Sequence, residues 1–154
     1  MFEWLNLNCT GGDSGTEPYL ASHYQLLAHA SICSSLQEKI SEISKRNHRH
    51  NISVFRYTPY SNHKVDKDAA NRALDFMYGW FMEPLTSGKY PESMISLVGE
   101  RLPKFSEEEA RLVTGSYDFI GLNYYTTAYA ANAPKTRPNY DSDSNVKTSL
   151  KVKG

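Results

Sequence analysis

The sequence predicts a protein of the α/β class in which helices outnumber strands. Apolar residues recur at helical spacing in two long segments, 17–31 and 66–83, and this spacing is typical of amphipathic helices. The continuously apolar start of segment 119–125 indicates a buried strand. One strand cannot form a sheet, so these patterns alone do not complete a fold.

The N-terminal third divides into a helix and a segment without periodicity. Thr16 is expected to cap the first helix, with Glu17 near the positive end of the helix dipole and Pro18 in the first turn. Segment 17–31 carries one apolar face. Segment 32–56 keeps neither the period of a helix nor that of a strand, so we expect a loop or a disordered insert there.

Helical spacing returns at Asp66 and is expected to end at Pro84, because proline lacks the backbone N–H that a continuing helix needs. The apolar side chains of this helix, among them Met77 and Trp80, need a surface to pack against. In a partial fold we expect that surface to be incomplete.

The remaining elements follow from local signals. Pro91 is expected to open a short helix. Ser106 and Glu109 have the spacing of a capping box and are expected to start another. Segment 131–154 is rich in Pro, Asn, Asp, Ser and Lys, and we expect a loop or a disordered tail there.

Composition excludes several classes of protein. The chain has 154 residues, 17 basic and 17 acidic side chains, and 40% apolar residues, which is enough for one domain with its own core. Zero net charge argues against a nucleic-acid binder held by bulk charge. No segment approaches the ~18 consecutive apolar residues of a membrane span, and no signal peptide is recognisable at the N-terminus.

Five motifs, in this order, carry a resemblance to a known family. They are Asn-Cys-Thr-Gly-Gly-Asp-Ser-Gly-Thr-Glu-Pro-Tyr-Leu at 8–20, the run from Arg72 to Leu85, Tyr-Pro-Glu-Ser-Met at 90–94, Arg-Leu-Pro-Lys-Phe at 101–105 and Asp-Phe-Ile-Gly-Leu-Asn-Tyr-Tyr-Thr-Thr at 118–127. Over 4–30 and 57–145 the chain resembles plant-type β-glucosidases of glycoside hydrolase family 1.

This resemblance implies a fold and an activity. The family has a (β/α)8 TIM barrel with its active site at the carboxyl ends of the strands. We expect residues 1–130 to form a partial barrel around strands 5 and 6, roughly the middle third of a family member. The family hydrolyses β-glucosides or short oligosaccharides with retention and without a cofactor. Its members are typically secreted or vacuolar, which leaves the compartment of this chain unknown.

The catalytic carboxylates of the family are not expected in this chain. Retaining glycosidases use two carboxyl groups ~5–5.5 Å apart. The family carries them in a Thr-x-Asn-Glu-Pro motif after strand 4 and an Ile/Val-Thr-Glu-Asn-Gly motif after strand 7, and neither motif occurs here. Glu17 lies in a Thr-Glu-Pro that lacks the preceding Asn, and we interpret it as a helix N-terminal residue.

We therefore expect no hydrolysis from the chain alone, and we assign no catalytic residue and no metal ligand. Two alternatives stay open. The chain is a non-catalytic fragment that binds sugar or a partner, or it is the product of a damaged gene and has no function.

Three residues match substrate-binding positions of the family. Asn123 and Tyr125 match residues that line the glucose subsite, and the tyrosine is expected to hydrogen-bond the nucleophile carboxylate. Asn62 matches a position that contacts the aglycone or an outer sugar.

Segment 32–56 departs from the family while keeping its spacing. Codons chosen for Lys39–Ser53 and read one base later encode Gly-Thr-Ile-Gly-Ile-Thr-Leu, the type of sequence that the family has in strand 5. We hypothesise that this segment was translated out of frame. The His-x-His at His48 and His50 lies in it and is only a weak signal for a metal site.

Overall fold

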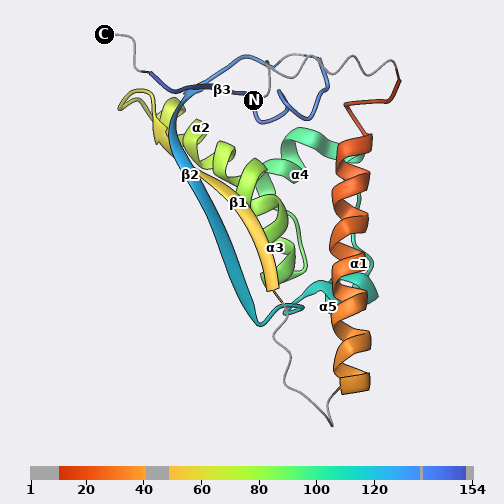
Figure 1. Ribbon diagram of the computed structural model, residues 1–154. Coiled ribbons are helices and arrows are strands. Elements are labelled where there is room, and N and C mark those ends of the chain that lie inside the picture. Colours follow the sequence, from red (N-terminus) through yellow and green to blue (C-terminus); the bar gives the residue numbers. More distant parts are fainter. Residues whose placement is uncertain (1–10, 41–48, 136, 152–154) are drawn as a thin grey trace.

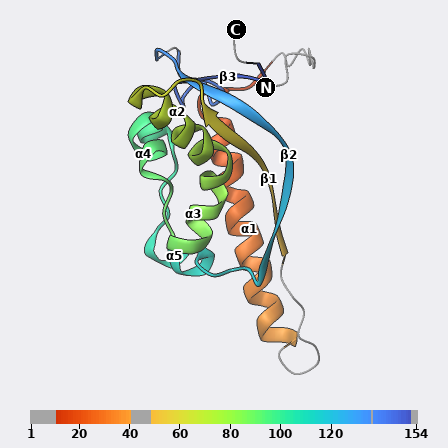
Figure 2. The ribbon, with the colours of Figure 1, turned by 90° about the vertical axis from the view of Figure 1, so that its left-hand side faces the viewer.

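Two long strands run side by side, and helices cover one side of the sheet that they form (Figures 1 and 2). The computed structural model describes residues 11–40, 49–135 and 137–151. Along the chain the elements are α1 Glu17–Ile40, β1 Arg49–Pro59, α2 Lys64–Leu74, a π-helical turn Asp75–Gly79, α3 Trp80–Ser87, α4 Glu92–Val98, a 3-10 turn Gly99–Arg101, α5 Glu107–Val113, β2 Phe119–Asn132 and β3 Val146–Ser149.

The strand order is β1-β2-β3. β1 pairs with β2 in parallel, from Arg49 opposite Phe119 to Pro59 opposite Ala130. β3 pairs antiparallel with the last residues of β2. Parallel strands need a long crossover, and helices α2 to α5 lie in that crossover. This arrangement confirms the α/β class.

The main core joins α1 to the crossover helices. Its buried residues are Tyr19, Leu26, Ala30, Trp80, Leu85, Tyr90, Met94, Val98, Leu102 and Val113. A second, smaller cluster of Ala70, Ala73 and Ala130 packs α2 directly on β2. The alanines allow the helix backbone to approach the strand closely, so this contact sets the height of α2 over the sheet.

Segment 32–56 is largely regular, and the expected loop or insert is wrong for its described part. Helix α1 continues to Ile40 and strand β1 begins at Arg49, while residues 41–48 lie outside the described part. The last turns of α1 contain Leu, Gln, Glu and Lys, which are strong helix formers, and Cys33 is buried. β1 is held by backbone pairing with β2, which does not require an alternating side-chain pattern.

Pro84 does not end its helix, contrary to expectation. It lies inside α3, which continues to Ser87 and ends at Gly88 with φ of 73°. The wider π-helical turn Asp75–Gly79 comes just before α3. In such a turn the backbone hydrogen bonds join residues i and i+5 instead of i and i+4, and helices often bend there. Pro84 and Leu85 are both fully buried, so their packing offsets the hydrogen bond that the proline cannot make.

The local signals for the two short helices are confirmed. Pro91 immediately precedes α4, and Gly99 follows it with φ of 63°. At α5 the Ser106 side chain accepts from the Glu109 backbone N–H, and the Glu109 carboxylate accepts from the Ser106 backbone N–H. Both bonds lie within four residues, so tertiary structure has little influence on them.

The C-terminal segment is more ordered than the expected loop or tail. β2 extends to Asn132, β3 occupies Val146–Ser149, and Asp143 between them is buried. The strand expected at 119–125 is present, but its expected burial is wrong. The four successive residues 122–125 are all exposed, Leu122 by 56% and Tyr125 by 70%. Because successive strand residues point to opposite faces of the sheet, this part of β2 is uncovered on both faces.

The uncovered part of the sheet predicts weak cooperativity in the isolated chain. Calorimetry should show a broad unfolding transition, with binding of a hydrophobic dye before the helical circular dichroism is lost. The physical reason is that exposed apolar strand residues gain little from fixed packing. A sharp calorimetric peak from a monomer would contradict this prediction.

Candidate functional site

Asn123 and Tyr125 lie close together in the middle of β2, and Asn62 lies apart from them. Asn123 is opposite Ser53 of β1, whereas Asn62 follows the end of β1, beyond the pair Pro59–Ala130. Ala130 is seven residues along β2 from Asn123, which corresponds to about 20 Å of strand. The structure therefore brings two of the three predicted residues together and places the third at the rim of the sheet.

Tyr125 lies in a β-bulge. Between the pairs Val54–Tyr124 and Arg56–Thr127, β2 advances three residues while β1 advances two. Tyr125 and Thr126 thus lie opposite the single residue Phe55. Bulges bend a strand and redirect side chains next to active sites. No pattern in the sequence indicated this bulge, because it depends on the register between two distant strands.

The side chains at the bulge are accessible. Asn123 is exposed and Tyr125 is 70% exposed. The neighbouring Tyr124 hydroxyl lies 2.8 Å from the Thr127 Oγ1, so this hydrogen bond spans the bulge. An amide and a phenol on a strand of this kind can hydrogen-bond sugar hydroxyls, and the phenol also offers a flat apolar face.

At the rim, the Asp66 carboxylate ties the end of β1 to the end of β2. The Ser61 hydroxyl donates to Asp66 Oδ2 at 2.5 Å. The backbone N–H of Asn132 donates to Asp66 Oδ1 at 2.8 Å. These bonds to the charged form lower the pKa of Asp66, the Ser61 hydroxyl having the largest effect. The carboxylate is therefore ionised at neutral pH.

Arg72 extends the same network toward the C-terminal segment. Its guanidinium donates to Asn132 Oδ1 at 2.7 Å, to the Ser144 carbonyl at 3.0 Å and to the Asn145 carbonyl at 3.3 Å. Asn145 has φ of 52°, an unusual value for a residue with a side chain. Arg72 thus holds the strained turn before β3 against the end of β2.

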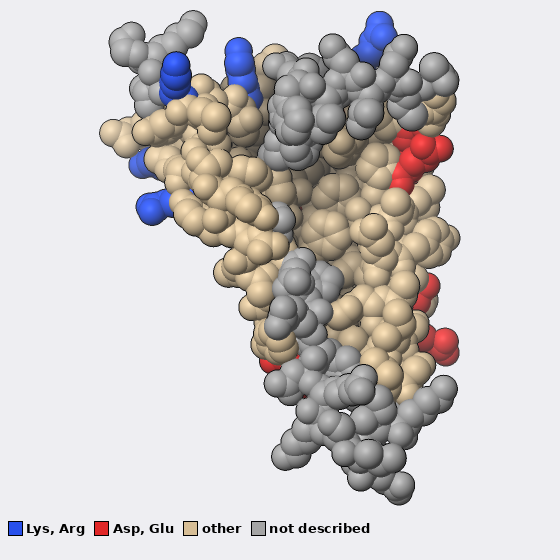
Figure 3. Space-filling model, viewed as in Figure 1, with Lys and Arg blue, Asp and Glu red and all other residues tan. Residues whose placement is uncertain are grey.

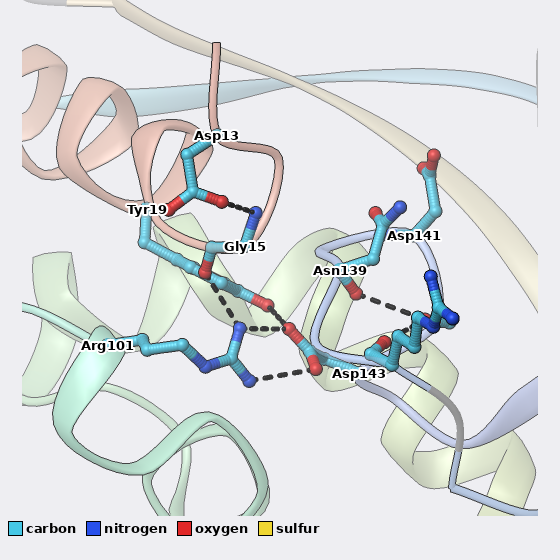
Figure 4. Close-up of polar contacts among 9 residues, drawn as sticks. Asp13, Gly15, Tyr19, Arg101, Asn139, Asp141 and Asp143 are labelled. Carbon is cyan, nitrogen blue, oxygen red and sulfur yellow. Dashed lines mark hydrogen bonds and ion pairs between the residues drawn. The ribbon is translucent and has the colours of Figure 1, made fainter.

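A third polar contact ties the N-terminal loop to the C-terminal segment (Figure 4). Arg101 donates two hydrogen bonds to the Asp143 carboxylate, at 2.8 and 2.9 Å, and a third to the Gly15 carbonyl at 2.7 Å. The Tyr19 hydroxyl donates to Asp143 at 2.8 Å. The pKa of Arg101 is raised, chiefly by its hydrogen bonds to Asp143. Burial, followed by Asp143, raises the pKa of Tyr19.

An apolar cavity of about 390 Å³ lies between the sheet, the crossover helices and the C-terminal segment. Its walls include Phe55 and Tyr57 of β1, Trp80 and Phe81 of α3, and Tyr140. Trp80 is nevertheless buried, with its ring near Tyr19 and Phe81. The surface expected to be incomplete for the second long helix is therefore partly provided by β1.

The described part of the chain contains no cluster of potential metal ligands. The described Lys and Arg side chains visible in Figure 3 lie near the strand ends, and the acidic ones lie mainly along the side of α1. No group of three or more potential metal ligands occurs among the described residues. The side chains of His48 and His50 lie outside the described part. None of the described helices is long and apolar enough to cross a membrane.

Comparison with known proteins identifies close relatives. The sequence profile of "Glycosyl hydrolase family 1" matches residues 5–153. A cyanogenic beta-glucosidase of Trifolium repens is 52% identical over 157 residues, covering 99% of this chain and 36% of that protein. Beta-glucosidase 12 of Oryza sativa subsp. indica is 48% identical over 144 residues, covering 92% of this chain and 28% of that protein.

Solved structures agree with the sequence comparison. The rice Os3BGlu6 beta-glucosidase superposes with a TM-score of 0.88 at 37% identity, covering 94% of this chain and 31% of that chain. A GH1 beta-glucosidase of Humicola insolens in complex with glucose superposes with a TM-score of 0.84 at 34% identity, covering 89% of this chain and 29% of that chain. The expected fold, part of a (β/α)8 barrel, is confirmed. The chain spans about a third of the length of these relatives.

The Arg101–Asp143 contact predicts a local loss of protection when it is broken. In Asp143→Asn the Tyr140 backbone N–H, which donates to the Ser14 carbonyl, should exchange with solvent about 100-fold faster. The reason is that removing the charge of one partner in a buried ion pair destabilises the contact by about 3 kcal/mol, and this free energy corresponds to about 100-fold in the opening equilibrium.

The matched control is Glu100→Gln, which removes the exposed pair that Glu100 forms with Lys104. It should change exchange at Tyr140 by less than about threefold. Equal exchange in both variants would show that Asp143 does not hold this segment.

Proposed function

Because the chain belongs to glycosyl hydrolase family 1, we propose that it forms the third of a retaining β-glucosidase barrel that contains strands 5 and 6. The observation that carries the proposal is the 52% identity to the Trifolium repens cyanogenic beta-glucosidase across 99% of this chain. The parallel pair of strands with a helical crossover is the arrangement that such a barrel repeats.

The chemistry of the complete enzyme needs two carboxylates that this part of the barrel does not contain. One acts as acid and base and the other as nucleophile, through a covalent glycosyl intermediate. In this proposal the other two thirds of the barrel carry both groups. The present residues bind the glucosyl unit and orient the nucleophile.

Asn123 and Tyr125 are assigned to that role. Their exposure leaves the amide and the phenol free to meet a sugar. The bulge gives Tyr125 a direction that regular strand geometry would not give it. A phenol hydroxyl that donates to the nucleophile carboxylate stabilises its charged form and lowers its pKa.

The proposed substrate class is a β-glucoside or a short β-linked oligosaccharide. Two of the similar structures contain the sugar itself. The Humicola insolens enzyme is in complex with glucose, and a rice Os3BGlu6 mutant is in a covalent complex with Glc. These ligands support glucose recognition by the barrel to which this chain is related.

A chimera tests the proposed activity. This chain replaces the corresponding third of the Trifolium repens enzyme, and release of a chromogenic aglycone from a β-glucoside is measured. We expect activity from the chimera and none from the chain alone, because only the chimera holds both carboxylates.

An inactive chimera that nevertheless folds would contradict the proposal. Folding is checked by a cooperative thermal transition, with the unmodified Trifolium repens enzyme as the reference. Glucose binding by an inactive chimera would favour the non-catalytic, sugar-binding alternative, and its absence would favour a product without function.

Tyr125→Phe in the chimera tests the assigned orienting role. We expect kcat to fall about 10- to 100-fold. The acid limb of the pH profile should move to higher pH, because the nucleophile loses a hydrogen bond that lowers its pKa. The control is Tyr129→Phe, on the regularly paired part of β2 opposite Thr58. If both variants give the wild-type pH profile, Tyr125 does not touch the nucleophile.

A further inference from the structure

We infer that Asp66 is a positioning residue that holds the turn carrying Asn62 against the end of β2, and thereby helps to select the group attached to glucose. The inference rests on the proposed function and extends it from the glucose subsite to the outer part of the substrate. It is carried by the two hydrogen bonds of the Asp66 carboxylate and by the absence of a capping role for that carboxylate.

Each carboxylate oxygen of Asp66 is bonded to the end of a different strand. Oδ2 accepts from Ser61, which follows β1, and Oδ1 accepts from the backbone of Asn132, the last residue of β2. A side chain on the first turn of α2 therefore bridges two strand ends at the edge where a barrel of this kind has its active site.

The Asn62 turn is built around this bridge. The Ser61 Oγ that donates to Asp66 also accepts from the His63 backbone N–H at 3.3 Å. The His63 carbonyl in turn accepts from the Asp66 backbone N–H at 3.1 Å. Asn62 lies between these two bonded residues and is itself exposed. Its backbone path is set by its neighbours, and its side chain is left available.

Helix α5 offers an internal comparison. Glu109 occupies the third position of α5, as Asp66 does in α2. Glu109 bonds back to Ser106 and caps its own helix, which is the usual use of an acid at this position. At the corresponding start of α2, the backbone N–H of His63 donates to the Ser61 Oγ and not to the Asp66 carboxylate. The Asp66 carboxylate is thus used to connect strand ends rather than to cap a helix.

The partner of Asp66 on β2 is itself held in place. Arg72, six residues further along the same helix, donates to Asn132 Oδ1 at 2.7 Å. Asp66 therefore binds the backbone of Asn132, and Arg72 binds the side chain of the same residue. Because the β2 end is immobilised, the bond from Asp66 to Ser61 positions the Asn62 turn relative to a fixed point.

The experiment compares two substrates in the chimera, phenyl β-glucoside and cellotriose, which share the terminal glucose and differ beyond it. In Asp66→Asn we expect kcat/KM for cellotriose to fall about tenfold relative to phenyl β-glucoside, mainly through KM. The matched control is Asp68→Asn, two residues along α2, where the exposed carboxylate pairs with Lys64 at 2.6 Å. The control should leave the ratio unchanged.

A double-mutant cycle separates positioning from simple destabilisation. If Asp66 acts through Asn62, Asp66→Asn should not change the substrate ratio further in an Asn62→Ala background. An equal loss for both substrates, or full additivity with Asn62→Ala, overturns the inference even if the chimera is active.

Failure of the proposed function is distinguishable from failure of the inference. If the unsubstituted chimera is inactive, the test is hydrogen exchange in the chain at the His63 backbone amide, which donates to the Ser61 Oγ. Asp66→Asn should accelerate exchange there at least tenfold, and Asp68→Asn should not. Unchanged exchange in Asp66→Asn overturns the inference.

Discussion

The parallel pairing of β1 with β2 is the constraint on which the rest of the structure depends. Two strands that run in the same direction bring their carboxyl ends to one edge, and the chain must return between them through a crossover. Helices α2 to α5 lie in that crossover and cover one side of the sheet (Figure 1). The shared edge and the covered face are thus consequences of a single pairing.

Polar contacts add to the apolar packing of Ala130 at the strand ends. Asp66 bridges β1 and β2, Arg72 joins β2 to the turn before β3, and Arg101 with Asp143 joins that segment to the N-terminal loop. Each contact connects segments that are far apart in sequence. Charged hydrogen bonds are directional, so they fix the geometry of exposed turns that a hydrophobic contact would leave loose. Of the candidate residues, Asn62 lies in a turn stabilised in this way, whereas Asn123 and Tyr125 lie within β2.

Family membership gives these features a common explanation. A barrel places its working residues at the carboxyl ends of its strands and covers the outside of the sheet with helices. The chain has the helix-covered parallel strands, but Asn123 and Tyr125 lie within β2 and not at its carboxyl end. It spans about a third of the length of its relatives. Residues 122–125 of β2 are exposed on both faces in the part of the barrel that this chain provides.

Elements with local causes could be predicted from the sequence, and elements with distant causes could not. The capping box at Ser106 and the glycine after α4 were predictable because their bonds span a few residues. The passage of α3 through Pro84 was not, since it depends on burial in a core built from α1. Side-chain periodicity indicated neither β1 nor β3, because backbone pairing with β2 holds both strands. The family resemblance alone predicted a strand in the position of β1.

For the candidate site, the residues were predictable from the sequence but their arrangement in space was not. The sequence by itself determined the family, the α/β class and the identity of Asn62, Asn123 and Tyr125, because motifs and residue types are written along the chain. Only the tertiary structure decided that Tyr125 lies in a bulge, that Asn62 lies about half the length of β2 away, and that Asp66 bridges two strand ends. The physical reason is that strand register and long-range hydrogen bonds depend on which distant segments meet.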